Sequence, residues 1–105
     1  MTYEVYTTKS FEKEMSSLSE EYQRRIKNIF LQMKENPYTG DPLQSKILRE
    51  KRLEEKRVYY LVFEDLKAVL FVAISDKKTQ QKTINFILEY INEYKAYLKE
   101  LLENN

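Results

Sequence analysis

The sequence contains no cysteine and no histidine. Without cysteine, disulfide bonds and thiolate chemistry are excluded. Without histidine, the chain lacks the commonest general base and the commonest transition-metal ligand in proteins. Ser-His triads, HExxH zinc sites and histidine-dependent nucleases are therefore excluded. No clustered Asp/Glu motif suggests a carboxylate metal site, so we expect neither a metal nor another cofactor.

Glycine and proline are scarce, with one Gly and two Pro in 105 residues, so long irregular loops are not expected. The chain is 42% hydrophobic and 33% charged, which favours a folded core over disorder. Its length fits one domain, and we assign residues 1–105 to it.

Long hydrophobic runs are also absent. The longest run, from Ala68 to Ile74, has the length of a strand and falls well short of the roughly 18 residues that cross a membrane. No N-terminal apolar stretch resembles a signal peptide. We therefore expect a cytoplasmic protein that does not interact with membranes.

The first part of the chain predicts a strand and two helices. Residues 3–7 alternate as a strand does, and Ser10 and Ser19 are the expected N-caps of two amphipathic helices. The apolar positions recur at helical spacing: Phe11, Met15 and Leu18 in the first helix, and Tyr22, Ile26, Ile29, Phe30 and Met33 in the second. This pattern indicates a helical hairpin, which the loop signals of residues 36–42 follow.

The rest of the chain predicts three strands, at residues 46–53, 56–63 and 67–75, and a final helix. The links Glu54-Glu55 and Asp65-Leu66 are so short that they require antiparallel hairpins. The last strand is apolar at consecutive positions, so we expect it inside the sheet. From about Lys77 the helical period returns, and one helix of about 25 residues would extend about 37 Å. The fold class is therefore α+β, in the order β-α-α-β-β-β-α, with a helical hairpin and a long C-terminal helix on an antiparallel-rich sheet.

The predicted first hairpin is strongly basic, although the whole chain has a net charge of only +1. A two-residue turn places Arg52 opposite Arg57, with Glu50 and Tyr59 on the same face. Two opposed arginines repel each other, so either Glu50 or a bound phosphate has to offset the repulsion. Three interpretations stay open: a solvated face with salt bridges, a site for an anion or an RNA backbone, and a surface for an acidic protein partner.

A second basic cluster precedes the predicted final helix and comprises Lys77, Lys78 and Lys82. Lysines beside a helix N-terminus suit an anion, whereas lysines at a strand end are often only a solvated flank.

These residues carry a resemblance to the RelE/ParE superfamily of toxins from toxin-antitoxin systems. The order of elements is similar, and a strand with an arginine is followed by a strand with Arg and Tyr and then by an apolar strand. The segments concerned are Arg49-Glu50-Lys51-Arg52-Leu53, Lys56-Arg57-Val58-Tyr59-Tyr60 and residues 69–74. The run from Lys77 to Thr83 resembles the Lys-Lys-Thr-Gln-Lys-Thr run of the HigB-like, phage-derived branch.

The resemblance implies a ribosome-dependent mRNA endonuclease that inhibits translation and that a cognate antitoxin protein neutralises. Carried over by position, Arg52, Arg57 and Lys78 are the candidate catalytic residues, and they would act on the phosphate without a metal. The candidate RNA-binding residues are Lys46, Arg49, Lys51, Tyr59, Lys77 and Gln80. A homodimer through the C-terminal helix is a further expectation, because its apolar stripe is long enough to contact a partner.

Many members of this superfamily carry a His-Arg pair or a late Tyr near the last strand, and residues 74–77 contain neither. Two alternatives to RNA cleavage therefore stay open. One is a ParE-like inhibitor of a topoisomerase, which needs no catalytic acid or base. The other is an inactive relative that uses the fold for protein interaction.

Overall fold

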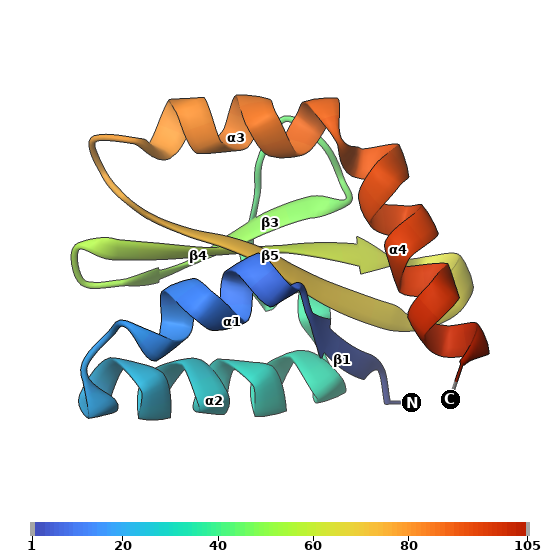
Figure 1. Cartoon of the computed structure of the whole chain (residues 1–105), viewed down its shortest axis with the longest axis horizontal. Coiled ribbons are helices and arrows are strands. Elements are labelled where there is room, and N and C mark those ends of the chain that lie inside the picture. The colour runs from blue at the N-terminus through green and yellow to red at the C-terminus, as the bar shows by residue number, and fades with distance from the viewer. Residues whose placement is uncertain (1, 105) are drawn as a thin grey trace.

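The computed structural model describes residues 2–104, which form a five-stranded sheet with helices on both faces (Figure 1). The elements in chain order are β1 (Glu4–Thr7), α1 (Lys9–Ser16), α2 (Glu20–Glu35), the 3-10 turn η1 (Pro37–Thr39), β2 (Asp41–Pro42), β3 (Leu48–Leu53), β4 (Lys56–Phe63), the 3-10 turn η2 (Glu64–Leu66), β5 (Ala68–Asp76), α3 (Gln80–Glu89) and α4 (Ile91–Glu103). The strand order is β1-β5-β4-β3-β2, with β1 parallel to β5 and the other pairs antiparallel. The α+β class and the antiparallel-rich sheet are confirmed.

The predicted helical hairpin is present as α1 and α2, which cover one face of the sheet (Figure 1). Phe11 and Ile26 are fully buried in the cluster that these helices form with β4 and β5. Ser19 caps α2 as predicted, because its side chain accepts a hydrogen bond from the Tyr22 amide. The predicted cap at Ser10 is wrong, since α1 begins two residues earlier and Thr8 accepts the bond from the Phe11 amide.

The β3–β4 hairpin has the predicted two-residue turn, and Arg52 pairs directly with Arg57. Glu54 adopts a φ of 55°, the left-handed conformation that lets so short a link reverse the chain. The apolar strand β5 lies between β1 and β4 and is buried along Ala68–Val72, as its continuous hydrophobic pattern predicts. A bulge in the β4–β5 pairing next to Tyr59 and Tyr60 shifts the register of the end of β5.

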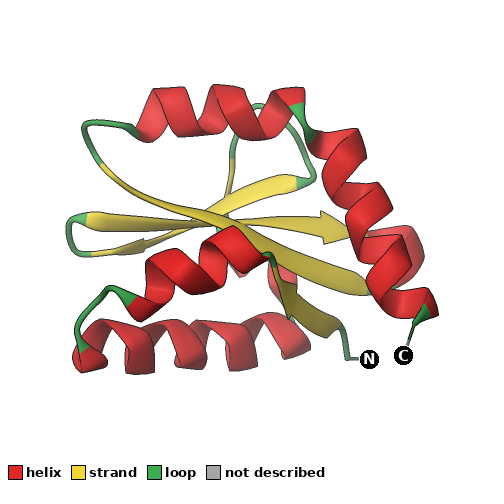
Figure 2. Ribbon diagram, in the orientation of Figure 1, coloured by secondary structure: helices red, strands yellow, loops and turns green. Residues whose placement is uncertain are grey.

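The prediction of one long C-terminal helix is wrong, because the chain bends at Tyr90 between α3 and α4 (Figure 2). The Tyr90 amide bonds to the Ile87 carbonyl, the tighter spacing that often closes a helix. A straight helix of about 37 Å would be longer than the longest extent of the molecule, 34 Å. The bend lets both segments pack on the second face of the sheet, where Ile87 of α3 and Leu98 of α4 are fully buried.

Within residues 2–104, no helix combines the length and the apolar character that crossing a membrane requires.

Candidate anion-binding pocket

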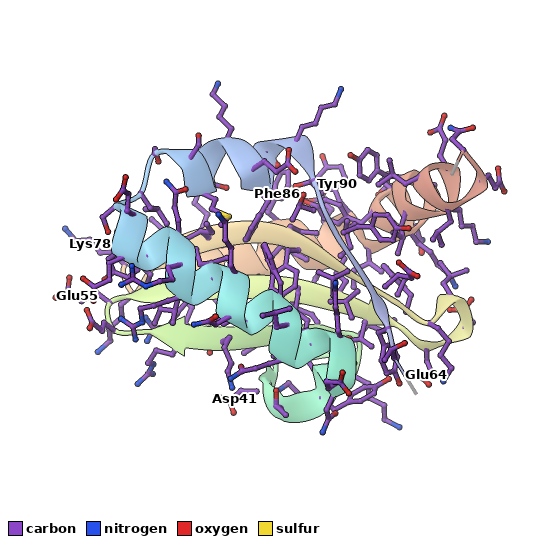
Figure 3. The ribbon with its side chains drawn as sticks, turned by 90° about the horizontal axis from the view of Figure 1, so that it is seen from below. Asp41, Glu55, Glu64, Lys78, Phe86 and Tyr90 are labelled. Carbon is purple, nitrogen blue, oxygen red and sulfur yellow. The ribbon has the colours of Figure 1, made fainter. Side chains whose placement is uncertain are left out.

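The register of three strands brings the predicted arginines to one end of the sheet. Arg52 of β3 lies opposite Arg57 of β4, and Arg57 lies opposite Ser75 of β5. Directly after β5 the chain continues as Lys77-Lys78 into α3, so both basic clusters of the sequence meet here. Figure 3 shows Lys78 and Glu55 at this end of the molecule, while Glu64 lies at the opposite end.

These elements enclose an open pocket of about 460 Å³, which we call the basic pocket. Its lining comprises four cationic and three anionic side chains: Arg52, Arg57, Lys77, Lys78, Glu54, Glu55 and Asp76. The structure therefore brings together all three candidate catalytic residues and one candidate RNA-binding residue, Lys77.

Two of the three carboxylates are held by other groups. Glu54 accepts a hydrogen bond from Arg25 of α2 at 3.1 Å, which draws it toward the helical hairpin. Asp76 accepts hydrogen bonds from the amide and the hydroxyl of Thr79, and these bonds lower the pKa of its carboxyl group. The ion pair with Arg25 offsets the charge of Glu54, whereas Asp76 keeps its negative charge beside the basic pocket.

Arg57 forms the floor of the basic pocket and is only 4% exposed. Its Nε lies 3.6 Å from Oε1 of Glu50, which is 7% exposed. That separation is too long for a hydrogen bond, and Nε is a buried donor without a partner among the described residues. The same Glu50 oxygen accepts a hydrogen bond of 3.0 Å from Gln80 of α3. Of the two offsets that the sequence left open, Glu50 is thus present, but it leaves Arg57 incompletely satisfied.

Arg52 differs from Arg57 because it is exposed at the rim of the basic pocket. No ion pair of Arg52, Lys77 or Lys78 is seen in the described part of the chain. The pocket therefore combines one buried, weakly paired guanidinium with three exposed cations, an arrangement suited to an anion such as phosphate.

Tyr59, a candidate RNA-binding residue, is fully buried beside this floor. Its hydroxyl lies 2.8 Å from Oγ of Ser75, which in turn bonds to the Asp76 carbonyl. Burial raises the pKa of the Tyr59 hydroxyl. A fully buried ring has no face open for a base to stack on, so Tyr59 supports the floor of the pocket in this structure.

The structure does not bring Lys46 and Arg49 to the basic pocket. Both line a different cavity with Tyr38 and the start of α4. The Arg49 guanidinium bonds to the carbonyls of Tyr38 and Gly40 and lies over the Tyr38 ring. Lys51 does not line the basic pocket either. It pairs with Val58, which packs against α1 and α2, so Lys51 lies on that face of the sheet.

From the sequence, Glu50 was predicted only as a possible partner for an arginine. No supporting role at the site was predicted for Ser75 or Asp76. An Asp three residues before a Thr is typical of a side-chain-bonded turn, and the sequence does contain this signal at Asp76 and Thr79. No local signal marks the contact between Gln80 and Glu50, because α3 has to fold back over β3 to make it. In the described residues no three Asp or Glu side chains group in a way that could hold a metal ion.

No family model matches the sequence, and no curated protein matches it. Solved structures with the same fold do exist. The free form of an arginine-substituted mutant of the E. coli toxin RelE is 15% identical, with a TM-score of 0.69 over 83% of this chain and 99% of that chain. The toxin-antitoxin complex RelBE2 from Mycobacterium tuberculosis gives 15% identity and a TM-score of 0.65 over 73% of this chain and 100% of that one. The archaeal RelE-RelB complex from Pyrococcus horikoshii gives 22% identity and a TM-score of 0.62 over 73% and 97%.

The chain thus has the RelE fold, as the sequence resemblance implied. The narrower resemblance to the HigB-like branch stays a prediction.

Proposed function

We propose that this protein, as one domain, is the toxin of a toxin-antitoxin system and that it cleaves mRNA on the ribosome in the cytoplasm. The RelE fold supports the first part. The observation that carries the second part is the basic pocket, in which Arg52, Lys77 and Lys78 surround the buried, incompletely bonded Arg57.

In the proposed reaction the ribose 2′-hydroxyl attacks the neighbouring phosphorus, and the bond from phosphorus to the 5′-oxygen breaks. The two arginines stabilise the negative charge that develops on the phosphate oxygens. Glu55 accepts the 2′-hydroxyl proton, and the Lys78 ammonium supplies a proton to the departing 5′-oxygen. The products are a 2′,3′-cyclic phosphate and a 5′-hydroxyl, and no metal takes part.

Antitoxin binding is part of the same proposal, because the similar structures include RelE bound to RelB. A homodimer through the C-terminal helices stays a prediction. Phe86 and Tyr90, which are 55% and 39% exposed at the α3–α4 bend, are the apolar side chains that such a contact would use.

The test is to induce the protein in bacterial cells and to follow growth, translation and mRNA integrity. Wild type should arrest growth and produce mRNA ends at ribosomes, whereas Arg52→Ala and Lys78→Ala should each weaken both effects at least tenfold, since a charged hydrogen bond contributes about 1.5–3 kcal/mol. Arg24→Ala, which removes an exposed arginine of α2, is the matched control and should behave as wild type.

Two results would contradict RNA cleavage. Growth arrest with intact mRNA and inhibited DNA gyrase would assign the protein to ParE-like topoisomerase inhibitors. No effect on growth or on translation in a ribosome assay would leave an inactive interaction module.

A further inference from the structure

Three side chains from separate elements, two of them buried, form a polar cluster under the basic pocket. Glu50 comes from β3, Arg57 from β4 and Gln80 from the first turn of α3. Glu50 and Arg57 are each more than nine-tenths buried. Charged groups at such depth are stable only when they are paired and hydrogen-bonded. A missing hydrogen bond among them therefore points to a group that another molecule can bind.

The bonding pattern of this cluster is uneven. Oε1 of Glu50 accepts the Gln80 amide at 3.0 Å, while Nε of Arg57 stays 3.6 Å from the same oxygen. Both donors approach the same carboxylate oxygen, but only Gln80 lies within hydrogen-bond distance of it. Arg57 Nε is buried without a hydrogen-bond partner in the described residues.

We propose that Gln80 is a positioning residue: it keeps Arg57 available for a phosphate group by holding the counter-ion of Arg57, Glu50, just beyond hydrogen-bond distance. Glu50 holds the guanidinium at the floor of the basic pocket by charge. The hydrogen bond from Gln80 holds the Glu50 carboxylate at a position where Oε1 stays 3.6 Å from Arg57 Nε, so the guanidinium is left weakly paired and able to bind an anion. This inference rests on the proposed function and names phosphate as the group that this floor recognises.

The position of Gln80 also couples the floor to the rim. Gln80 follows the Lys77-Lys78 segment by two residues, and Asp76 fixes that segment through Thr79. A shift of α3 would therefore move Gln80 and both rim lysines together. Gln80, predicted from the sequence to contact RNA, acts in this proposal through Glu50 and not on the RNA itself.

The test uses two variants with opposite expected effects on binding of a fully 2′-O-methylated, uncleavable RNA and of inorganic phosphate. Gln80→Ala frees the Glu50 oxygen for Arg57, so affinity should fall about fivefold. Glu50→Gln removes the buried counter-charge, so affinity should rise about tenfold. Both effects should disappear when Arg57→Lys is combined with either variant, because a lysine has no Nε donor in this place.

Matched controls separate positioning from simple changes in charge or helix stability. Gln81→Ala alters the next residue of α3, whose side chain bonds to Asn85, and should leave affinity within twofold. Glu35→Gln removes an exposed carboxylate at the end of α2, outside the lining of the basic pocket, and should leave affinity within twofold.

Glu50→Gln leaves a buried guanidinium without its counter-ion, so its melting temperature should be lower and should recover with phosphate more than that of wild type. If this variant does not fold, the sign of the Gln80→Ala effect decides. Affinity changes of the same sign, or both under twofold, would overturn the inference. If wild type binds phosphate with these opposite shifts but neither binds nor cleaves RNA, the proposed function fails and the positioning role stands.

Discussion

At the scale of single residues, Tyr60 and Gly40 join the loop after α2 to the sheet. Tyr60 is fully buried; its hydroxyl donates to the Pro37 carbonyl at 2.8 Å and accepts from the Gly40 amide at 3.1 Å. Burial raises the pKa of Tyr60 to about 12, so its proton stays in place at any ordinary pH. Gly40 has an extended backbone, and the close approach to Tyr60 is what requires a glycine here.

We expect Tyr60→Phe to lower the free energy of unfolding by about 1–3 kcal/mol, because it leaves a buried carbonyl and a buried amide without partners. Gly40→Ala should cost about 1–3 kcal/mol, since its Cβ would overlap Tyr60 Oη and lie 2.8 Å from the Glu50 carbonyl oxygen. Urea titration measures both. Because Tyr60→Phe also removes the atom that the new Cβ overlaps, the double variant should lose less than the sum, and strict additivity would contradict this explanation.

Residue-level prediction from the sequence succeeded where the chain itself sets the geometry. The two-residue link at Glu54-Glu55 fixes the pairing of Arg52 with Arg57, and the structure has that pairing. The burial of Arg57 could not be predicted in the same way. It depends on α3 lying over the hairpin, and no spacing in the sequence specifies that contact.

At the scale of elements, the bend at Tyr90 is the main difference from the sequence-based expectation. The apolar stripe runs on through residues 84–101, and periodicity alone gives no reason to interrupt it. The reason is tertiary: the sheet is too short for a straight helix, and Ile87 and Leu98 both reach the core only if the chain turns. Neither glycine nor proline marks the bend, so the sequence carried no local signal of it.

Leu98 should anchor α4, since it is the one residue of that helix that is fully buried in the described structure. We expect Leu98→Ala to lower the free energy of unfolding by about 2–4 kcal/mol, the usual cost of a cavity of this kind. Hydrogen exchange in α4 should accelerate more than in α2. Leu101→Ala, on the partly exposed side of the same helix, is the control and should cost well under half as much; equal costs would argue against the anchoring role of Leu98.

Glu64, in the turn between β4 and β5, links three elements by charge and hydrogen bonds. It pairs with Lys67, and the hydroxyls of Tyr38 and Tyr3 donate to it. These contacts, that with Lys67 first, lower the pKa of the Glu64 carboxyl group from 4.5 to about 2. The linkage therefore connects the segment just before β1, η1 and the β4–β5 turn.

Because the pKa of Glu64 is lower in the folded than in the unfolded chain, its contribution to stability is complete above pH 4.5 and lost as the pH falls toward 2. Carboxyl NMR titration should place the midpoint of Glu64 well below 4.5. The slope of melting temperature against pH in this window should decrease in Glu64→Gln. A midpoint near 4.5 would show that the three contacts do not hold the carboxylate in solution.

At the scale of the whole molecule, the charge is nearly balanced but unevenly placed. The net charge is +1, yet Arg52, Arg57, Lys77 and Lys78 gather at one end of the sheet. Glu54 is paired with Arg25 and Glu50 is buried and bonded to Gln80, whereas Arg52, Lys77 and Lys78 are exposed, so an incoming polyanion meets these three cations. A low net charge is therefore compatible with local attraction of a phosphate chain.

The affinity for single-stranded RNA should consequently fall with salt concentration, and the slope should reflect the number of cations that contact phosphate. Each phosphate neutralised on a single strand contributes a slope of about −0.7 in log K against log salt, so four contacts predict a slope of roughly −3. Lys78→Ala should make the slope shallower by about 0.7, because one counterion fewer is released. Lys27→Ala, which removes an exposed lysine of α2, should leave it unchanged. Fluorescence anisotropy over a series of potassium chloride concentrations measures all three. If Lys27→Ala and Lys78→Ala altered the slope equally, the attraction would come from the overall charge of the protein. That result would contradict the basic pocket as the site that binds phosphate.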